Sequence, residues 1–156
     1  MIDSHAHLGL CEAGANELVA AAREAGVNHI LTVGLGEDTN PGAIELAGEY
    51  EGVFASVGRH PNSAAGFYES DAEELERLAA SDDVVAVGET GLDLYREGSP
   101  LDEQRRALAF QIEVAREVAK PLVMHIRDPD GSEDAVKECF ETLDAQAEGV
   151  KVILHC

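Results

Sequence analysis

The sequence has no tryptophan and only three cysteines, Cys11, Cys139 and Cys156. The cysteines are scattered, odd in number and form no C-x-x-C pair, a pattern that indicates reduced thiols rather than a disulfide framework. No run of about 18 apolar residues is present, so the sequence predicts no membrane-spanning helix. Met1 leads directly into an expected strand instead of a basic and apolar leader, so we expect no signal peptide and a cytoplasmic protein.

Basic residues are also scarce. The chain has 11 lysines and arginines against 31 acidic residues, which gives a formal net charge of -20 at pH 7. Such a surface repels nucleic acid and anionic membranes at long range. A solvated acidic surface is the simplest explanation, and a salt-adapted host is a more specific one. With 156 residues, of which 45% are apolar, we expect one domain over residues 1–156 with a sizeable core.

Strand and helix patterns alternate along the chain. Strands are predicted at residues 2–8, 27–33, 53–57, 84–87, 121–126 and 151–154. Helices are predicted at residues 16–25, 40–50, from a Ser70-x-x-Glu73 capping box, from Ser99-Pro100, and at 132–147. Several strands are apolar almost throughout, as strands of a parallel sheet covered by helices are. Two α/β architectures fit, an open doubly wound sheet and a β/α barrel.

Individual residues refine these helices. Gly26 is expected to end the first helix, and Asn40 to cap the second one, with Pro41 in its first turn. In the last helix we expect four side chains to point inward, namely Val136, Cys139, Phe140 and Leu143.

Polar side chains gather where the predicted strands end. His5 and His7 are two residues apart on the first strand and therefore point to the same face. Later strands end at Arg59 and His60, at Glu89, at His125 and Arg127, and at His155. Five of the six histidines follow this rule, and His29, at the opposite end of its strand, is expected to be structural. In a parallel barrel the carboxyl ends form the functional face, so the pattern predicts a metal site there.

At this point the chain resembles the TatD-like metal-dependent hydrolases. The matching segments are Asp-Ser-His-Ala-His-Leu at 3–8, Gly-Arg-His-Pro at 58–61, Gly-Glu-Thr-Gly-Leu-Asp at 88–93, Met-His-Ile-Arg-Asp at 124–128 and Leu-His-Cys at 154–156. The resemblance implies a TIM-type (β/α)8 barrel and a divalent-metal hydrolase, with many members acting as deoxyribonucleases on DNA. It also implies metal ligands at His5, His7, Glu89, His125 and His155, with Glu89 bridging two ions. His60 is implied to line the site near a substrate phosphate.

The chain departs from the family pattern after the sixth strand. The family has two further strands, and the last ends in an aspartate that binds metal and helps to position the attacking water. An eight-stranded barrel normally needs roughly 200 residues or more. We therefore expect a barrel truncated to about six β/α units, which binds at most one ion firmly and has little activity by itself.

The expected chemistry is hydrolysis of a phosphodiester by water activated between two divalent ions, Zn, Mn or Mg, with Glu89 and His125 as catalytic residues. His60, Arg59 and Arg127 are the candidate substrate contacts, because an arginine fork binds two phosphate oxygens. Arg96 also follows a strand end. As a structural alternative, Arg127 pairs with Asp128, or Arg96 with Asp93, to hold loops.

Three other functions remain open. The same activated water serves a deacylase that cleaves an ester on aminoacyl-tRNA. Another amide or lactone hydrolase is a second possibility, although related barrels often bridge their metals with a lysine and this chain has Glu89 in its place. The third is a metal-binding module without turnover. No stable protein partner and no membrane are indicated.

Overall fold

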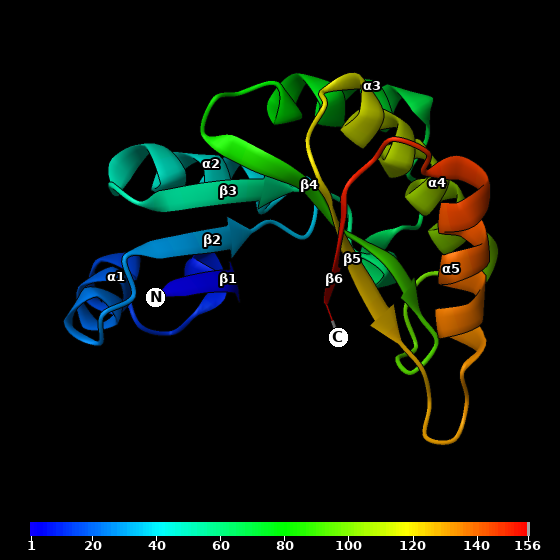
Figure 1. Ribbon diagram of the computed structural model, residues 1–156, viewed down its shortest axis with the longest axis horizontal. Coiled ribbons are helices and arrows are strands. Elements are labelled where there is room, and N and C mark those ends of the chain that lie inside the picture. Colours follow the sequence, from blue (N-terminus) through cyan, green and yellow to red (C-terminus); the bar gives the residue numbers. More distant parts are fainter. Residues whose placement is uncertain (156) are drawn as a thin grey trace.

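A computed structural model describes residues 1–155 of the chain as a curled parallel sheet flanked by helices (Figure 1). Every neighbouring pair of strands is parallel. The six strands are β1 (Ile2–Ala6), β2 (His29–Val33), β3 (Val53–Val57), β4 (Val84–Asp93), β5 (Leu122–Arg127) and β6 (Val152–His155).

The helices lie along the outer side of the sheet (Figure 1). Five α-helices are described, α1 (Ala15–Glu24), α2 (Asn40–Glu49), α3 (Glu69–Ala79), α4 (Leu101–Glu117) and α5 (Asp134–Gln146). Two short 3-10 helices, η1 (Leu8–Leu10) and η2 (Pro61–Ser63), follow β1 and β3. None of the described helices has the length and apolar character needed to cross a bilayer.

The order of the strands decides between the two predicted architectures. The sheet runs β1-β2-β3-β4-β5-β6, whereas a doubly wound sheet reverses its order at a switch point. The sheet also curls. This is seen from the imidazole rings of His5 on β1 and His155 on β6, which are stacked with centroids 3.6 Å apart. The two outermost strands thus approach each other at their carboxyl ends. The six strands form part of a β/α barrel, as predicted.

The hydrophobic core fills the space between the sheet and the helices. Its larger part joins β3, β4 and β5 to α2, α3, α4 and α5, with Leu92, Leu108, Ile112, Leu122 and Met124 fully buried. A smaller cluster around Val19 and Ile30 holds α1 against β1 and β2. This packing fixes the carboxyl ends of the strands, where the polar residues lie.

The fourth strand differs most from its prediction. The apolar pattern of the sequence predicts that this strand ends at Val87. In the structure β4 continues to Asp93, with a register shift between Val87 and Thr90. Gly88 and Gly91 permit this course, since a Cβ on either would overlap a carbonyl oxygen of β5. Both have positive φ angles, 124° and 145°, which glycine adopts without strain. Glu89 therefore lies within a strand rather than after one.

Two predicted helix starts are wrong. The N-cap of α2 is Thr39, and the side chain of Asn40 instead bonds the backbone of Gly58. Helix α3 starts at Glu69, so Ser70 and Glu73 form no capping box; the Asp71 carboxylate accepts the backbone N–H of Tyr68.

The inner face of α5 was only partly predicted. Cys139 is fully buried, and burial raises the pKa of its thiol to about 12. Leu143 packs against the core, but Val136 and Phe140 are 40% and 45% exposed. The prediction that these two residues point inward is wrong, because the helix presents a narrower apolar stripe to the sheet. Gly26, by contrast, follows α1 with φ of 82°, as predicted for a terminating glycine.

Candidate metal centre

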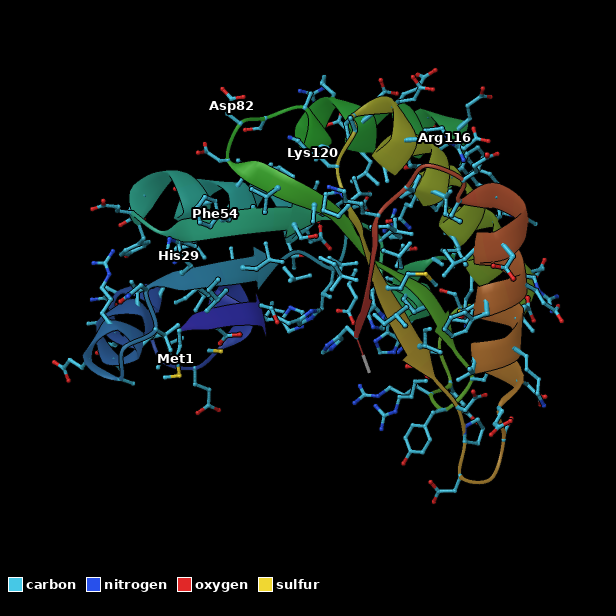
Figure 2. All side chains as sticks on the ribbon, in the orientation of Figure 1. Met1, His29, Phe54, Asp82, Arg116 and Lys120 are labelled. Carbon is cyan, nitrogen blue, oxygen red and sulfur yellow. The ribbon has the colours of Figure 1, made fainter. Side chains whose placement is uncertain are left out.

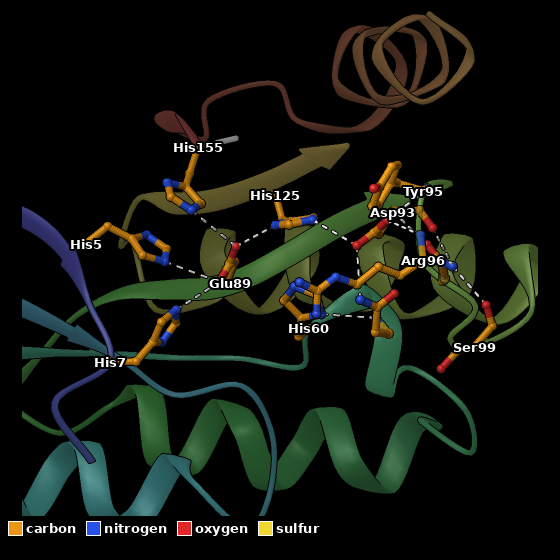
Figure 3. Close-up of polar contacts among 12 residues, drawn as sticks. His5, His7, His60, Glu89, Asp93, Tyr95, Arg96, Ser99, His125 and His155 are labelled. Carbon is orange, nitrogen blue, oxygen red and sulfur yellow. Dashed lines mark hydrogen bonds and ion pairs between the residues drawn. The ribbon is translucent and has the colours of Figure 1, made fainter. Parts of the chain in front are cut away.

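A buried carboxylate stands among four histidines at the carboxyl ends of the strands (Figure 3). Glu89 is 2% exposed. Its Oε1 lies 2.7 Å from Nδ1 of His125 and 3.7 Å from Nε2 of His155. Its Oε2 lies 3.2 Å from Nε2 of His5 and 3.8 Å from Nε2 of His7. The fold thus brings together, around one carboxylate, five residues that are 150 positions apart in sequence at their extremes.

The two histidines of the first strand converge as their spacing predicts. Their ring centroids are 5.0 Å apart and both Nε2 atoms face Glu89. The Nδ1 of His7 lies 2.9 Å from the carbonyl oxygen of Val33 and donates to it. That bond places the ring proton on Nδ1 and leaves Nε2 with a free lone pair. Metal-binding histidines typically have this arrangement.

Unpaired ring nitrogens indicate that the cluster suits a metal ion. Among the residues that the structure describes, both nitrogens of His5 and the Nε2 of His125 are buried without a hydrogen-bond partner. Buried polar atoms without partners are costly, and a bound cation would satisfy them. Two groups of three residues also have potential ligand atoms within 4.8 Å of one another, and both contain Glu89: His5, His7 and Glu89, and His60, Glu89 and His125.

The protonation states of Glu89 and His155 also suit metal binding. Burial alone would raise the pKa of Glu89, but the hydrogen bond from His125 and the adjacent His5 imidazole outweigh it and hold this pKa well below its usual range. Burial and the neighbouring His5 lower the pKa of His155. At neutral pH the cluster therefore offers an ionised carboxylate and a neutral imidazole, the forms that bind metals.

Asp93 is a residue of the site that the sequence analysis missed. It is 1% exposed, and its Oδ2 lies 3.4 Å from Nε2 of His125 and accepts a 3.0 Å hydrogen bond from the side-chain amide of Asn62. Its Oδ1 accepts the backbone N–H groups of Tyr95 and Arg96, both at 2.9 Å. Burial raises its pKa, but these hydrogen bonds prevail and lower it. Asp93 was overlooked because β4 was expected to end early; on a strand that continues, residues 89, 91 and 93 share a face.

His60 lies beside His125, with ring centroids 4.5 Å apart. Its Nδ1 accepts the backbone N–H of Asn62 at 3.1 Å, so the proton of the neutral ring is on Nε2. Burial and the neighbouring His125 lower the pKa of His60 to about 4. The structure therefore places a neutral imidazole N–H donor within the cluster.

The structure separates Arg59 from the other predicted site residues. Its guanidinium lies 3.6 Å from Glu37 and 5.5 Å from the ring centroid of Phe67. These groups line a small cavity with residues of α2 and α3, on the outer side of the sheet. The backbone of Arg59 instead bonds the Gln111 side chain: its N–H donates to Oε1 of Gln111 at 2.8 Å, and its carbonyl accepts from Nε2 of Gln111 at 3.1 Å.

Neither proposed loop-holding ion pair forms among the described residues. The Asp128 carboxylate accepts the backbone N–H groups of Ala135 and Val136 at the start of α5. The Arg127 guanidinium instead lies 4.1 Å from the ring centroid of Tyr95. Arg96 contacts Asp93 through its backbone N–H and not through its guanidinium.

A curled parallel sheet with histidines and carboxylates at its carboxyl ends defines a β/α-barrel protein with a candidate divalent-metal centre. The model of the family described as TatD related DNase matches residues 2–156. The chain belongs to this family.

The relatives agree with this assignment. The chain is 35% identical over 158 residues to the uncharacterized metal-dependent hydrolase YabD of Bacillus subtilis, covering all of this chain and 60% of YabD. It is 36% identical over 113 residues to the 3'-5' ssDNA/RNA exonuclease TatD of Escherichia coli, covering 72% of this chain and 44% of that protein. The matched region thus spans 60% of the length of YabD and 44% of that of TatD.

Solved structures show the same fold. YjjV, a TatD homologue from Escherichia coli, superimposes with a TM-score of 0.79 at 26% identity, covering 94% of this chain and 56% of YjjV. A TatD family hydrolase from Entamoeba histolytica gives a TM-score of 0.83 at 22% identity, covering all of this chain and 57% of that one.

Proposed function

We propose that the chain carries the metal-binding part of a divalent-metal-dependent phosphodiesterase that acts on nucleic acid. The observation that carries this proposal is the buried, ionised Glu89 among four histidines, at the strand ends where barrel enzymes place their sites. Metal ions held there supply an activated water at neutral pH and neutralise charge on a phosphodiester.

We assign His5, His7, Glu89, His125 and His155 as the ligands of two ions, with Glu89 as the shared one. Two observations support the shared role of Glu89: it belongs to both candidate ligand groups, and its two oxygens face different histidines. A carboxylate between two cations also offsets their mutual repulsion. The mixture of imidazole and carboxylate donors suits zinc or manganese, and magnesium less well.

His60 and Arg127 are the substrate contacts in this proposal. The Nε2–H of neutral His60 donates to a phosphate oxygen, and its orientation is held by the backbone of Asn62. Arg127 brings positive charge to the strand ends of a chain whose net charge is -20. Arg59 is left out, because its guanidinium faces Glu37. The nucleic-acid substrate is supported by relatives named as ssDNA/RNA exonucleases.

The test compares Glu89→Gln with Glu113→Gln, which changes an exposed carboxylate on α4 in the same way. Because the chain spans only part of its relatives, both variants are made in a fusion with the carboxyl-terminal region of a full-length relative. We expect Glu89→Gln to abolish metal-dependent cleavage of single-stranded DNA and to reduce metal content measured by mass spectrometry. Glu113→Gln should change neither, and circular dichroism verifies that both variants are folded.

An aminoacyl ester and a lactone serve as competing substrates in the same assay. Metal-dependent cleavage of either one without cleavage of DNA would reassign the substrate class. Full activity of Glu89→Gln would remove this residue from the site.

A further inference from the structure

An arginine and an exposed tyrosine form a pair where β4 and β5 end. The Arg127 guanidinium carbon lies 4.1 Å from the centroid of the Tyr95 ring, which is close enough for a cation–π interaction. Tyr95 is 54% exposed. Hydrogen bonds fix the backbone beneath the pair, since Leu94 N–H donates to the Arg127 carbonyl at 2.8 Å and Tyr95 N–H to Asp93 Oδ1 at 2.9 Å. The ring is thus presented to solvent from a rigid support.

Strand register places this pair next to the metal centre. On β5, His125 and Arg127 share a face, with buried Ile126 between them on the other face. Arg127 therefore lies one two-residue step, about 6.6 Å, beyond His125 toward the strand end. Its register partner on β4 is Asp93, whose carboxylate lies 3.4 Å from the His125 ring. Figure 3 shows Tyr95 beside Asp93, at the edge of the cluster.

A second tyrosine–arginine pair provides a comparison, because its arginine is also held by other residues of the chain. Arg106 lies 4.7 Å from the ring centroid of Tyr68, which is 56% exposed. Arg106 is also held by Glu103 at 3.2 Å and donates to the carbonyl oxygen of Phe67 at 3.1 Å. Among the described residues Arg127 has no ion pair, and its sequence neighbour Asp128 caps α5 instead.

We propose that Tyr95 and Arg127 form a stacking platform for an unpaired base of a single-stranded nucleic acid bound at the metal centre. The proposal rests on the function proposed above. Every base has a π-face, so an exposed aromatic ring binds single strands with little sequence preference. Arg127 offers its guanidinium edge to the backbone phosphate and its charge to an otherwise acidic chain. A duplex, whose bases are stacked within it, cannot use this platform.

The first test measures binding of fluorescent phosphorothioate oligonucleotides, which resist cleavage, by anisotropy at low ionic strength in the presence of Mn²⁺. We expect Tyr95→Ala to weaken binding of a single strand roughly 5- to 150-fold, the value of one stacked base. Tyr95→Phe, which retains the ring, should bind almost as the parent chain does. An oligonucleotide whose residues lack bases should bind the parent chain and Tyr95→Ala equally. Tyr68→Ala is the matched control and should have no effect.

The second test uses the absence of tryptophan from the chain. Tyr95→Trp creates a unique fluorophore on the platform, and we expect single strands to quench it more than the oligonucleotide without bases does. Tyr68→Trp should not be quenched.

The outcomes separate this inference from the function on which it rests. If the parent chain binds no oligonucleotide, both the platform and the nucleic-acid substrate are overturned. If it binds single strands but Tyr95→Ala binds equally well, or loses affinity equally for the oligonucleotide without bases, only the platform is overturned.

Discussion

The side-chain amide of Asn40 forms two hydrogen bonds with the backbone of Gly58, one in each direction. Its Nδ2 donates to the Gly58 carbonyl at 3.0 Å, and its Oδ1 accepts the Gly58 N–H at 3.1 Å. Asn40 is 4% exposed. The bonds fix the end of β3 just before Arg59 and His60, so the start of α2 holds the loop that presents His60 to the histidines around Glu89.

Asn40→Ala would leave a buried N–H and a buried carbonyl without partners. We expect the free energy of unfolding to fall by about 2 kcal/mol or more, as measured by urea titration. Asn16→Ala, at an exposed position in α1, is the control and should change it by less than about 0.5 kcal/mol. Equal stability of the two variants would show that water replaces the amide at Gly58.

We expect loss of a histidine to lower metal affinity at the carboxyl end of the sheet but not at its amino end. His5→Gln removes a proposed ligand at the carboxyl end, and we expect metal affinity measured by calorimetry to fall at least about 10-fold. His29 lies at the other end of the sheet, exposed and stacked on Phe54 with centroids 6.0 Å apart (Figure 2). His29→Gln should leave metal affinity unchanged. A comparable loss in both variants would contradict the orientation assigned to the barrel.

The cap of α5 makes stability depend on pH through Asp128. Burial raises the pKa of this carboxyl, but the N–H groups of Ala135 and Val136 outweigh burial and keep it below its usual value. A lowered folded-state pKa means that the stabilisation is present above the unfolded pKa of about 3.9 and is lost as the pH falls through the folded value.

Asp128→Ala should therefore lower the free energy of unfolding by about 1 kcal/mol at neutral pH. Because the protonated side chain is a weaker cap, the difference in stability from the parent chain should close as the pH falls below the unfolded pKa of about 3.9. Urea unfolding across this pH range measures both effects. Asp130→Ala, in the same loop but exposed, provides the comparison. A gap that is independent of pH would mean that the Asp128 charge contributes nothing to the cap.

The sequence predicted that Glu89 and four histidines lie close together because the signal for this is local. Five of the six histidines lie at or near the carboxyl end of a strand, and parallel strands bring these ends together without further information. The choice of a barrel over a doubly wound sheet was settled only by the strand order, which depends on packing between distant segments.

Sequence patterns are least informative where a side chain interacts with a group that is distant in sequence. Asn40 has the residue type of a helix cap, yet its amide bonds Gly58, eighteen positions further on. Arg59 has the charge of a phosphate ligand, yet its side chain turns to the outer side of the sheet. Asp93 was missed because two glycines let β4 continue beyond its apolar run. Local propensity contains no information about such long-range partners.

The inner face of the curled sheet is the surface from which we predict self-association of the isolated 156-residue chain. Near the amino ends of the strands this face exposes Ile2, Phe54 and Val85, which line one apolar hollow. On β6, Ile153 and Leu154 are 44% and 53% exposed. In the described sheet β1 is bonded only to β2, and β6 only to β5, so each has one edge of unpaired backbone groups. Apolar surface next to open strand edges promotes association.

Light scattering over a concentration series tests this expectation, with two substitutions that distinguish the inner face from other exposed apolar positions. Phe54→Lys puts a charge into the hollow and should shift the chain toward monomer, because association would then bury that charge. Val136→Lys changes an equally exposed residue, 40% against 38%, but on α5 outside the curl, and should leave association unchanged. Fusion to the carboxyl-terminal region of a full-length relative should give a monomer, since additional strands would pair with the open edges of β1 and β6. An unfused chain that is monomeric and unfolds cooperatively would contradict this prediction, because its inner face would then be stable in water without additional strands.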